Sequence, residues 1–218
     1  MKMSLVLKND VIEPVIQFVT GLIESQDWKG RYSALRALGC INEGPEKTRF
    51  AQILIPSMTQ LLSMFDDKSV KVREGISWVT FQICQHHADV MVGSAESTAF
   101  FVNILTRSIQ DQPKISAYIC QAIEKFAKSL EPMDPSQQAN SLTPHFETLA
   151  QALIQNTTRV DEDDVNSNLV IKSYTGLISL CEYCCTDSYK SLQAILMHGL
   201  QKLEESISES PSQRLNDI

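Results

Sequence analysis

Apolar residues recur at helical spacing across residues 66–87, DDKSVKVREGISWVTFQICQHH. The repeating apolar positions are Val72, Ile76, Val79 and Ile83. Steps of four, three and four residues place these side chains on one face of an α-helix. Asp67 stands just before the pattern, where its carboxylate can accept hydrogen bonds from the free N–H groups of a first helical turn. The sequence therefore predicts a helix over residues 68–87 that is capped by Asp67.

The same pattern recurs in three other stretches of the chain. With Arg73 as the reference position, the equivalent residues are Arg31, Ser116 and Lys172. The residues three and six positions later are Ala34 and Ala37, Ile76 and Val79, Ile119 and Ala122, and Thr175 and Ile178. The intervals from residue 31 to 73 and from 73 to 116 fall inside the roughly 40–47-residue period of HEAT and armadillo units. A second helical pattern precedes each stretch, so the repeating unit is a pair of helices.

We therefore expect an all-α fold, an α-solenoid in which antiparallel helix pairs of the HEAT or armadillo kind stack into a superhelix. The expected organisation is a single array over residues 1–218, with approximate units at 10–44, 47–88, 92–130, 140–186 and 187–218, the last one incomplete. The last predicted helix, 188–206, is followed by a predicted turn. Because the chain starts on half a helical pattern and stops after that turn, we expect it to be part of a longer array.

Composition narrows the function. The chain has 218 residues, of which 43% are hydrophobic, with a formal net charge of −7 and a pI near 5.1. A nucleic-acid binder presents a basic surface to the phosphate backbone, so this balance argues against nucleic acid and favours a basic partner. No apolar run approaches the roughly 20 residues that cross a bilayer, so no membrane insertion is expected. Six irregularly spaced cysteines are typical of reduced thiols in the cytosol or nucleus.

Candidate catalytic and metal-binding residues are few. Cys181, Cys184, Cys185 and His198 are zinc-ligand residue types, but structural zinc sites pair two short chelating spacings and this stretch has one. Buried cysteines on a helix face are the expected interpretation. Cys84 is followed by two histidines that are too close to face it on a helix. Because the sequence also lacks a Gly-rich phosphate loop, a Gly-x-Ser-x-Gly and a His-Glu-x-x-His pattern, we expect no enzyme activity, metal or cofactor.

Trp78 is the candidate binding residue. It lies five positions after the reference, to one side of the apolar stripe, and the equivalent residues are Arg36, Gln121 and Leu177, which do not form a regular core position. Glu74 lies one helical turn earlier on the same face. A carboxylate beside an indole can hold an arginine or lysine by a charge-assisted hydrogen bond and a cation–π contact together. The alternative is that Trp78 only packs against the neighbouring unit.

Several stretches of the chain resemble the importin beta family of nuclear-import receptors. They are QDWKGRYSALRALGCINEGPE (26–46), DKSVKVREGISWVTFQIC (67–84), PKISAYICQAIEKFA (113–127) and, more weakly, SYTGLISLCEY (173–183). The resemblance implies a HEAT superhelix whose second helices line the concave face, in the middle of a receptor several times longer. It also implies binding of the basic segment of importin alpha or of basic cargo, release by Ran in its GTP form, contacts with Phe-Gly nucleoporins, and a location in cytoplasm, nucleus and nuclear pore.

The resemblance also implies which residues of this chain bind importin alpha. Trp78 and Glu74 match an inner-face tryptophan and an acidic position of the family, whereas Gln121 replaces another family tryptophan. Asp161 and Glu162 belong to an acidic run that we expect to form a solvated loop or a secondary contact for a basic partner. We thus expect an acidic, tryptophan-bearing concave surface that holds a basic helix. The rival hypothesis is a structural HEAT scaffold, similar to a phosphatase regulatory subunit, in which Trp78 is a packing residue.

Overall fold

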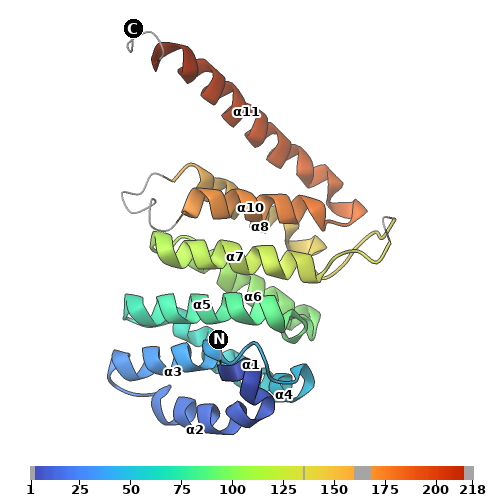
Figure 1. Ribbon diagram of the computed structural model, residues 1–218. Coiled ribbons are helices and arrows are strands. Elements are labelled where there is room, and N and C mark those ends of the chain that lie inside the picture. Colours follow the sequence, from blue (N-terminus) through green and yellow to red (C-terminus); the bar gives the residue numbers. More distant parts are fainter. Residues whose placement is uncertain (1–2, 135, 160–167, 214–218) are drawn as a thin grey trace.

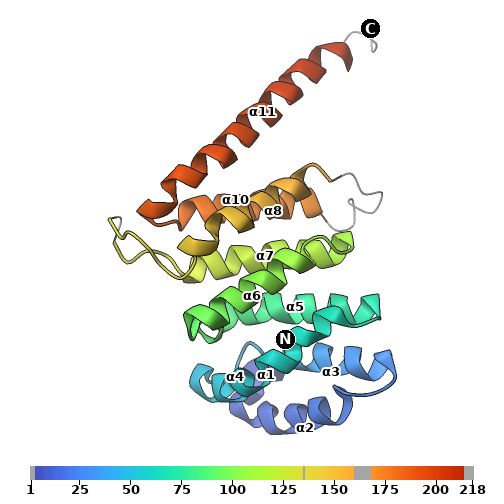
Figure 2. The same ribbon diagram turned by 180° about the vertical axis from the view of Figure 1, so that it is seen from behind.

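The computed structural model describes residues 3–134, 136–159 and 168–213, and no strand occurs in these ranges. Helices stack in two layers (Figures 1 and 2). The first layer contains α2 (Ile12–Leu22), α4 (Lys47–Ser63), α6 (Ala95–Ser108) and α8 (Phe146–Thr157). The second layer contains α3 (Trp28–Cys40), α5 (Val70–His86), α7 (Pro113–Ser129) and α10 (Leu169–Glu182). The fold is an all-α solenoid, as the repeat pattern predicted.

Short elements lead into α2 or lie between the long helices. They are α1 (Met3–Leu7) and the 3₁₀ turns η1 (Lys8–Val11), η2 (Met64–Asp66), η3 (Ala88–Val92), η4 (Thr143–His145) and η5 (Thr186–Ser188). Gly44, between α3 and α4, has a φ of +118°, a conformation that L side chains rarely adopt. A Cβ at this position would also overlap the Ser4 backbone of α1. Glycine is therefore required at residue 44, where α1 packs against the connection between α3 and α4.

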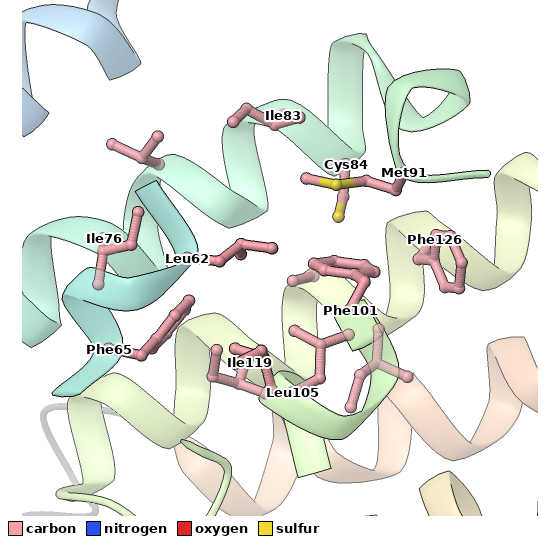
Figure 3. Packing of buried hydrophobic residues seen from close by; sticks show 14 of the residues in the cluster. Leu62, Phe65, Ile76, Ile83, Cys84, Met91, Phe101, Leu105, Ile119 and Phe126 are labelled. Atoms are coloured by element: carbon pink, nitrogen blue, oxygen red, sulfur yellow. The ribbon is translucent and has the colours of Figure 1, made fainter. Parts of the chain in front are cut away.

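The apolar stripe of α5 forms the centre of the core. Val72, Ile76, Val79 and Ile83 are each at most 1% exposed, which confirms the predicted face. Figure 3 shows the α5 residues Ile76 and Ile83 facing Leu62 from the first layer, with Ile119 of α7 among the same cluster. Phe101 of α6 and Phe126 of α7 meet edge to face, with their ring centroids 5.3 Å apart. The core is thus continuous from one unit to the next.

Arginine–aspartate pairs join consecutive units of the second layer. Arg31 of α3 donates to both carboxylate oxygens of Asp67, at 2.7 and 2.9 Å, and Arg73 of α5 pairs in the same way with Asp111, at 2.6 and 3.1 Å. The Asp67 cap prediction is wrong: Ser69 is the N-cap residue of α5. Asp67 accepts from the Ser69 backbone N–H, but its main partner is an arginine in the preceding unit.

The third junction uses different side chains in the same place. The Ser116 hydroxyl donates to the Asp111 carbonyl at 2.9 Å, and the guanidinium of Arg159 donates to that hydroxyl at 3.0 Å. The reference positions of the repeat, Arg31, Arg73 and Ser116, are therefore the residues that fix one unit against the next. They hold the N-terminal ends of α3, α5 and α7 along one edge of the stack.

The last helix differs from its prediction. Helix α11 runs from Tyr189 to Gln213, so the turn expected after residue 206 is replaced by continued helix. It extends away from the stack in both views (Figures 1 and 2). Leu196, Leu200 and Leu203 on this helix are 55–66% exposed. No helix in the described part of the chain is long and apolar enough to cross a membrane.

Candidate partner-binding site

Trp78 lies at the junction of α3 and α5. The indole is half-buried, and its six-membered ring lies directly against Gly39 of α3, where a methyl group would overlap it. The guanidinium carbon of Arg36, also on α3, lies 3.7 Å from the ring centroid. This distance is well within the roughly 6 Å range of a cation–π contact. The indole therefore already holds an arginine, and this arginine comes from the same chain.

Glu74 is also engaged within the chain. Its side chain is only 11% exposed, and its carboxylate oxygens pair with Lys71 Nζ at 3.0 Å and Lys114 Nζ at 2.5 Å. Burial disfavours the charged carboxylate, but the two lysines outweigh it and hold the pKa of Glu74 below its usual value. Glu74 thus links α5 to α7, whereas Trp78 links α5 to α3.

An apolar hollow of about 440 Å³ borders Trp78. Its walls include Val11 and Val15 next to α1, Ala37 and Ile41 at the end of α3, and Trp78 itself. Gln121 of α7, at the register position of Trp78 one unit later, is half-buried. Trp78 therefore presents an aromatic face and a small apolar recess on the α3 side of α5, whereas the Glu74 carboxylate pairs with a lysine of α7, so the two predicted site residues contact different neighbouring helices.

Comparison with known proteins places this geometry in a family. A family model described as importin subunit beta-1-like, TPR repeats, matches residues 101–216, which is more than half of the chain. The chain belongs to the importin beta-1-like family. Importin subunit beta-1 of Saccharomyces cerevisiae is 23% identical over 205 residues, which cover 94% of this chain and 23% of the yeast protein. The chain thus spans about a quarter of the length of this importin beta relative.

Solved importin beta structures have the same fold. One crystal structure of importin beta superposes with a TM-score of 0.83 at 26% identity, covering 94% of this chain and 24% of that one. Kap95p bound to RanGDP gives 0.82 at 22% identity, covering 94% of this chain and 23% of that one. The Kap95:Nup1 complex gives 0.80 at 22% identity, covering 92% of this chain and 22% of that one. The solenoid of this importin beta-like chain therefore has the fold of the matching parts of those structures.

The helices that carry Trp78 and Glu74 hold more basic than acidic residues, whereas an acidic surface was predicted for the site. The four second-layer helices carry nine basic residues, Lys29, Arg31, Arg36, Lys71, Arg73, Lys114, Lys125, Lys128 and Lys172. Their three acidic residues are Glu74, Glu124 and Glu182. Because the net charge of −7 belongs to the whole chain, it did not show that this layer is basic. Asp161 and Glu162 lie outside the described residues.

The cysteine–histidine cluster makes contacts of a structural kind. Cys184 Sγ donates to the Cys181 carbonyl at 3.2 Å, and His198 Nε2 lies 2.7 Å from the Thr157 hydroxyl. Burial raises the pKa of the Cys181 thiol, which disfavours the thiolate that a metal or a reaction would need. In the described parts of the chain, no group of three His, Cys, Asp or Glu residues is placed to hold a metal ion.

Proposed function

We propose that this chain is a segment of a nuclear-import receptor that binds the basic segment of importin alpha, or basic cargo, at Trp78. The observation that carries the proposal is the Arg36 guanidinium on the Trp78 ring, because it means that this face of the indole accepts an arginine. An arginine of the partner takes the place of Arg36. A second basic side chain of the partner reaches Glu74 in exchange for Lys71 or Lys114.

The role is binding rather than catalysis, and other steps belong to the longer receptor. The complex of Kap95p with RanGDP supports Ran as a partner of that receptor, and we propose that Ran in its GTP form releases the cargo. Shuttling between cytoplasm and nucleus through the pore follows from the same proposal. The rival role, a structural HEAT scaffold, is favoured by the close packing of Trp78 on Gly39.

A double-mutant cycle separates the receptor from the scaffold. We expect Trp78→Ala to weaken binding of a fluorescein-labelled importin-alpha basic segment by roughly 2–30-fold, the range of a cation–π contact. Arg36→Ala is expected to strengthen binding several-fold, because the partner arginine no longer competes for the ring. In the Trp78→Ala background the same Arg36 substitution should have no such effect.

Lys29→Ala is the matched control for Arg36→Ala. It removes one positive charge from the same helix, but Lys29 is not the side chain that lies on the indole. The control therefore measures how much binding improves when a basic peptide is simply repelled less. Equal gains from Arg36→Ala and Lys29→Ala would show that charge alone is responsible and that Trp78 is not the site. If Trp78→Ala binds as well as the unmodified chain, the scaffold role is favoured.

The first layer offers a separate contact for nucleoporins. A hollow of about 250 Å³ lies between α4 and α6, and Ile55 and Phe100 at its rim are 59% and 46% exposed. We propose that it holds the phenylalanine of a Phe-Gly nucleoporin, a proposal that the Kap95:Nup1 complex supports. Phe100→Ser should weaken capture of a Phe-Gly peptide. Ile178→Ser, which removes an apolar side chain that is 64% exposed from α10, should not.

A further inference from the structure

Lysines stand at equivalent positions along one edge of the second layer. Lys29, Lys71 and Lys114 are the second residues of α3, α5 and α7, and all three are exposed. Lys172 on α10 is half-buried and stands two positions later in the repeat, at the reference position, so it does not belong to this series. We call Lys29, Lys71 and Lys114 the lysine row. The pairs that join Arg31 to Asp67 and Arg73 to Asp111 keep these helix ends side by side.

Helix stability does not explain the lysine row. The N-terminal end of a helix carries a partial positive charge, so acidic residues stabilise it and lysines oppose it. None of the four second-layer helices has an acidic residue in its first turn. In the first layer, α2, α6 and α8 have Glu13, Glu96 and Glu147 there. The row therefore adds lysine charge to helix ends that carry a partial positive charge, which only α3 offsets with an acidic N-cap residue, Asp27.

One carboxylate is already bound within the row. Glu74 lies between Lys71 and Lys114, and its two oxygens pair with the ammonium groups of two successive units. This arrangement shows how neighbouring positions of the row accept a carboxylate. The side chains of Lys71 and Lys114 nonetheless remain 56% and 59% exposed, so both still present positive charge to solvent at this edge of the layer.

We propose that the lysine row binds an acidic segment of a partner protein, laid across the N-terminal ends of α3, α5 and α7. Packed helices are roughly 8–10 Å apart, which is about the length of three residues of an extended chain. A segment with a carboxylate at about every third residue therefore matches the row. A long nucleic acid fits less well, because beyond the row it meets a chain whose net charge is −7.

This inference does not rest on the importin-alpha proposal, although both involve Lys71, Lys114 and Glu74; because the two partners have opposite charge, their binding is measured separately. The test uses the full chain and a fluorescein-labelled peptide, (Glu-Ser-Gly)₄-Glu, in a fluorescence-anisotropy titration at low salt. The row variant carries Lys29→Gln, Lys71→Gln and Lys114→Gln together. The control variant carries Lys8→Gln, Lys47→Gln and Lys190→Gln, which remove the same charge from exposed positions on η1, α4 and α11.

We expect the row variant to lose at least roughly fivefold in affinity, as the sum of three exposed ion pairs, while the control variant changes less than about twofold. Far-ultraviolet circular dichroism checks that both variants keep their helices. Equal losses in the two variants, or no binding by the unmodified chain, would overturn the proposal. It would also be overturned if a single-stranded oligonucleotide bound the row more tightly than the peptide did.

Discussion

Gly39→Ala tests whether the Trp78 ring is held where the binding proposal needs it. A Cβ on Gly39 would lie 2.7 Å from both Cε3 and Cη2 of the indole, and nearer still to Cζ3. Overpacking of this kind typically costs about 1–3 kcal/mol. Alanine is the better helix former by about 0.5–1 kcal/mol, which opposes that cost. We therefore expect a net loss of stability of roughly 0.5–2 kcal/mol.

Gly21→Ala is the matched control, because Gly21 also lies in a helix, α2, but an added Cβ meets no atom within 4 Å. Only the gain in helix propensity remains, so this variant should be more stable than the unmodified chain by about 0.5–1 kcal/mol. Urea denaturation followed by circular dichroism measures the difference between the two variants. The chain has two tryptophans, so a Trp28→Phe background isolates the emission of Trp78.

Two results together would refute the reasoning. The first is a Gly39→Ala variant that is as stable as Gly21→Ala. The second is an unchanged Trp78 emission spectrum in that variant, which would mean that the indole does not rest on Gly39. If the ring is displaced as expected, its contact with Arg36 is lost too. Gly39→Ala should then weaken binding of the basic peptide, as Trp78→Ala does.

Three further predictions concern charge. The Arg31 hydrogen bond holds the pKa of Asp67 below its usual value, and Arg73 does the same for Asp111 against the opposing effect of burial. The stability from both pairs is therefore full above about pH 4 and is lost as the pH falls through the lowered pKa values. Urea denaturation from about pH 6 to 2.5 should then show a smaller loss of stability in acid for Asp67→Asn than for the unmodified chain. Burial lowers the pKa of His87 despite its contact with the Asn42 carbonyl, so a second loss of stability should begin below about pH 6.5 and be absent from His87→Gln. Lys29→Glu should raise stability by about 0.3–1 kcal/mol in the same assay, because it puts a negative charge at a helix N-terminus. The same substitution should weaken binding of the acidic peptide. An unchanged or lower stability would contradict the account of the lysine row.

The helices followed from the sequence, but their long-range partners did not. Spacing of Val72, Ile76 and Val79 fixes a buried face whatever lies opposite, so α5 was predictable within about two residues at each end. The same spacing cannot say which loop carboxylate faces which arginine, and a local cap was the nearest interpretation for Asp67. A usable indication was present in the repeat: the paired residues are separated by 36 and 38 positions in two successive units.

The candidate site shows the same limit. A helical wheel placed Trp78 beside the apolar stripe, but its partner was identifiable only from the repeat, because Arg36 occupies the equivalent position one unit earlier. Equivalent positions in successive units become neighbours when the units stack. The tryptophan and the arginine were therefore predictable as a pair. The two lysines that hold Glu74 are Lys71 from the first turn of the same helix and its equivalent in the next unit, Lys114.

The distribution of charge decides how the two proposed partners approach. A net charge of −7 acts over the whole chain, but the second-layer helices carry the opposite excess. At about 0.01 M salt the screening length is roughly 30 Å, so a basic peptide is attracted by the chain as a whole. At about 0.15 M it is roughly 8 Å, and the peptide then meets mainly the basic layer around Trp78. Stacking on the indole rather than attraction must therefore hold the basic partner, whereas the lysine row attracts an acidic partner at short range.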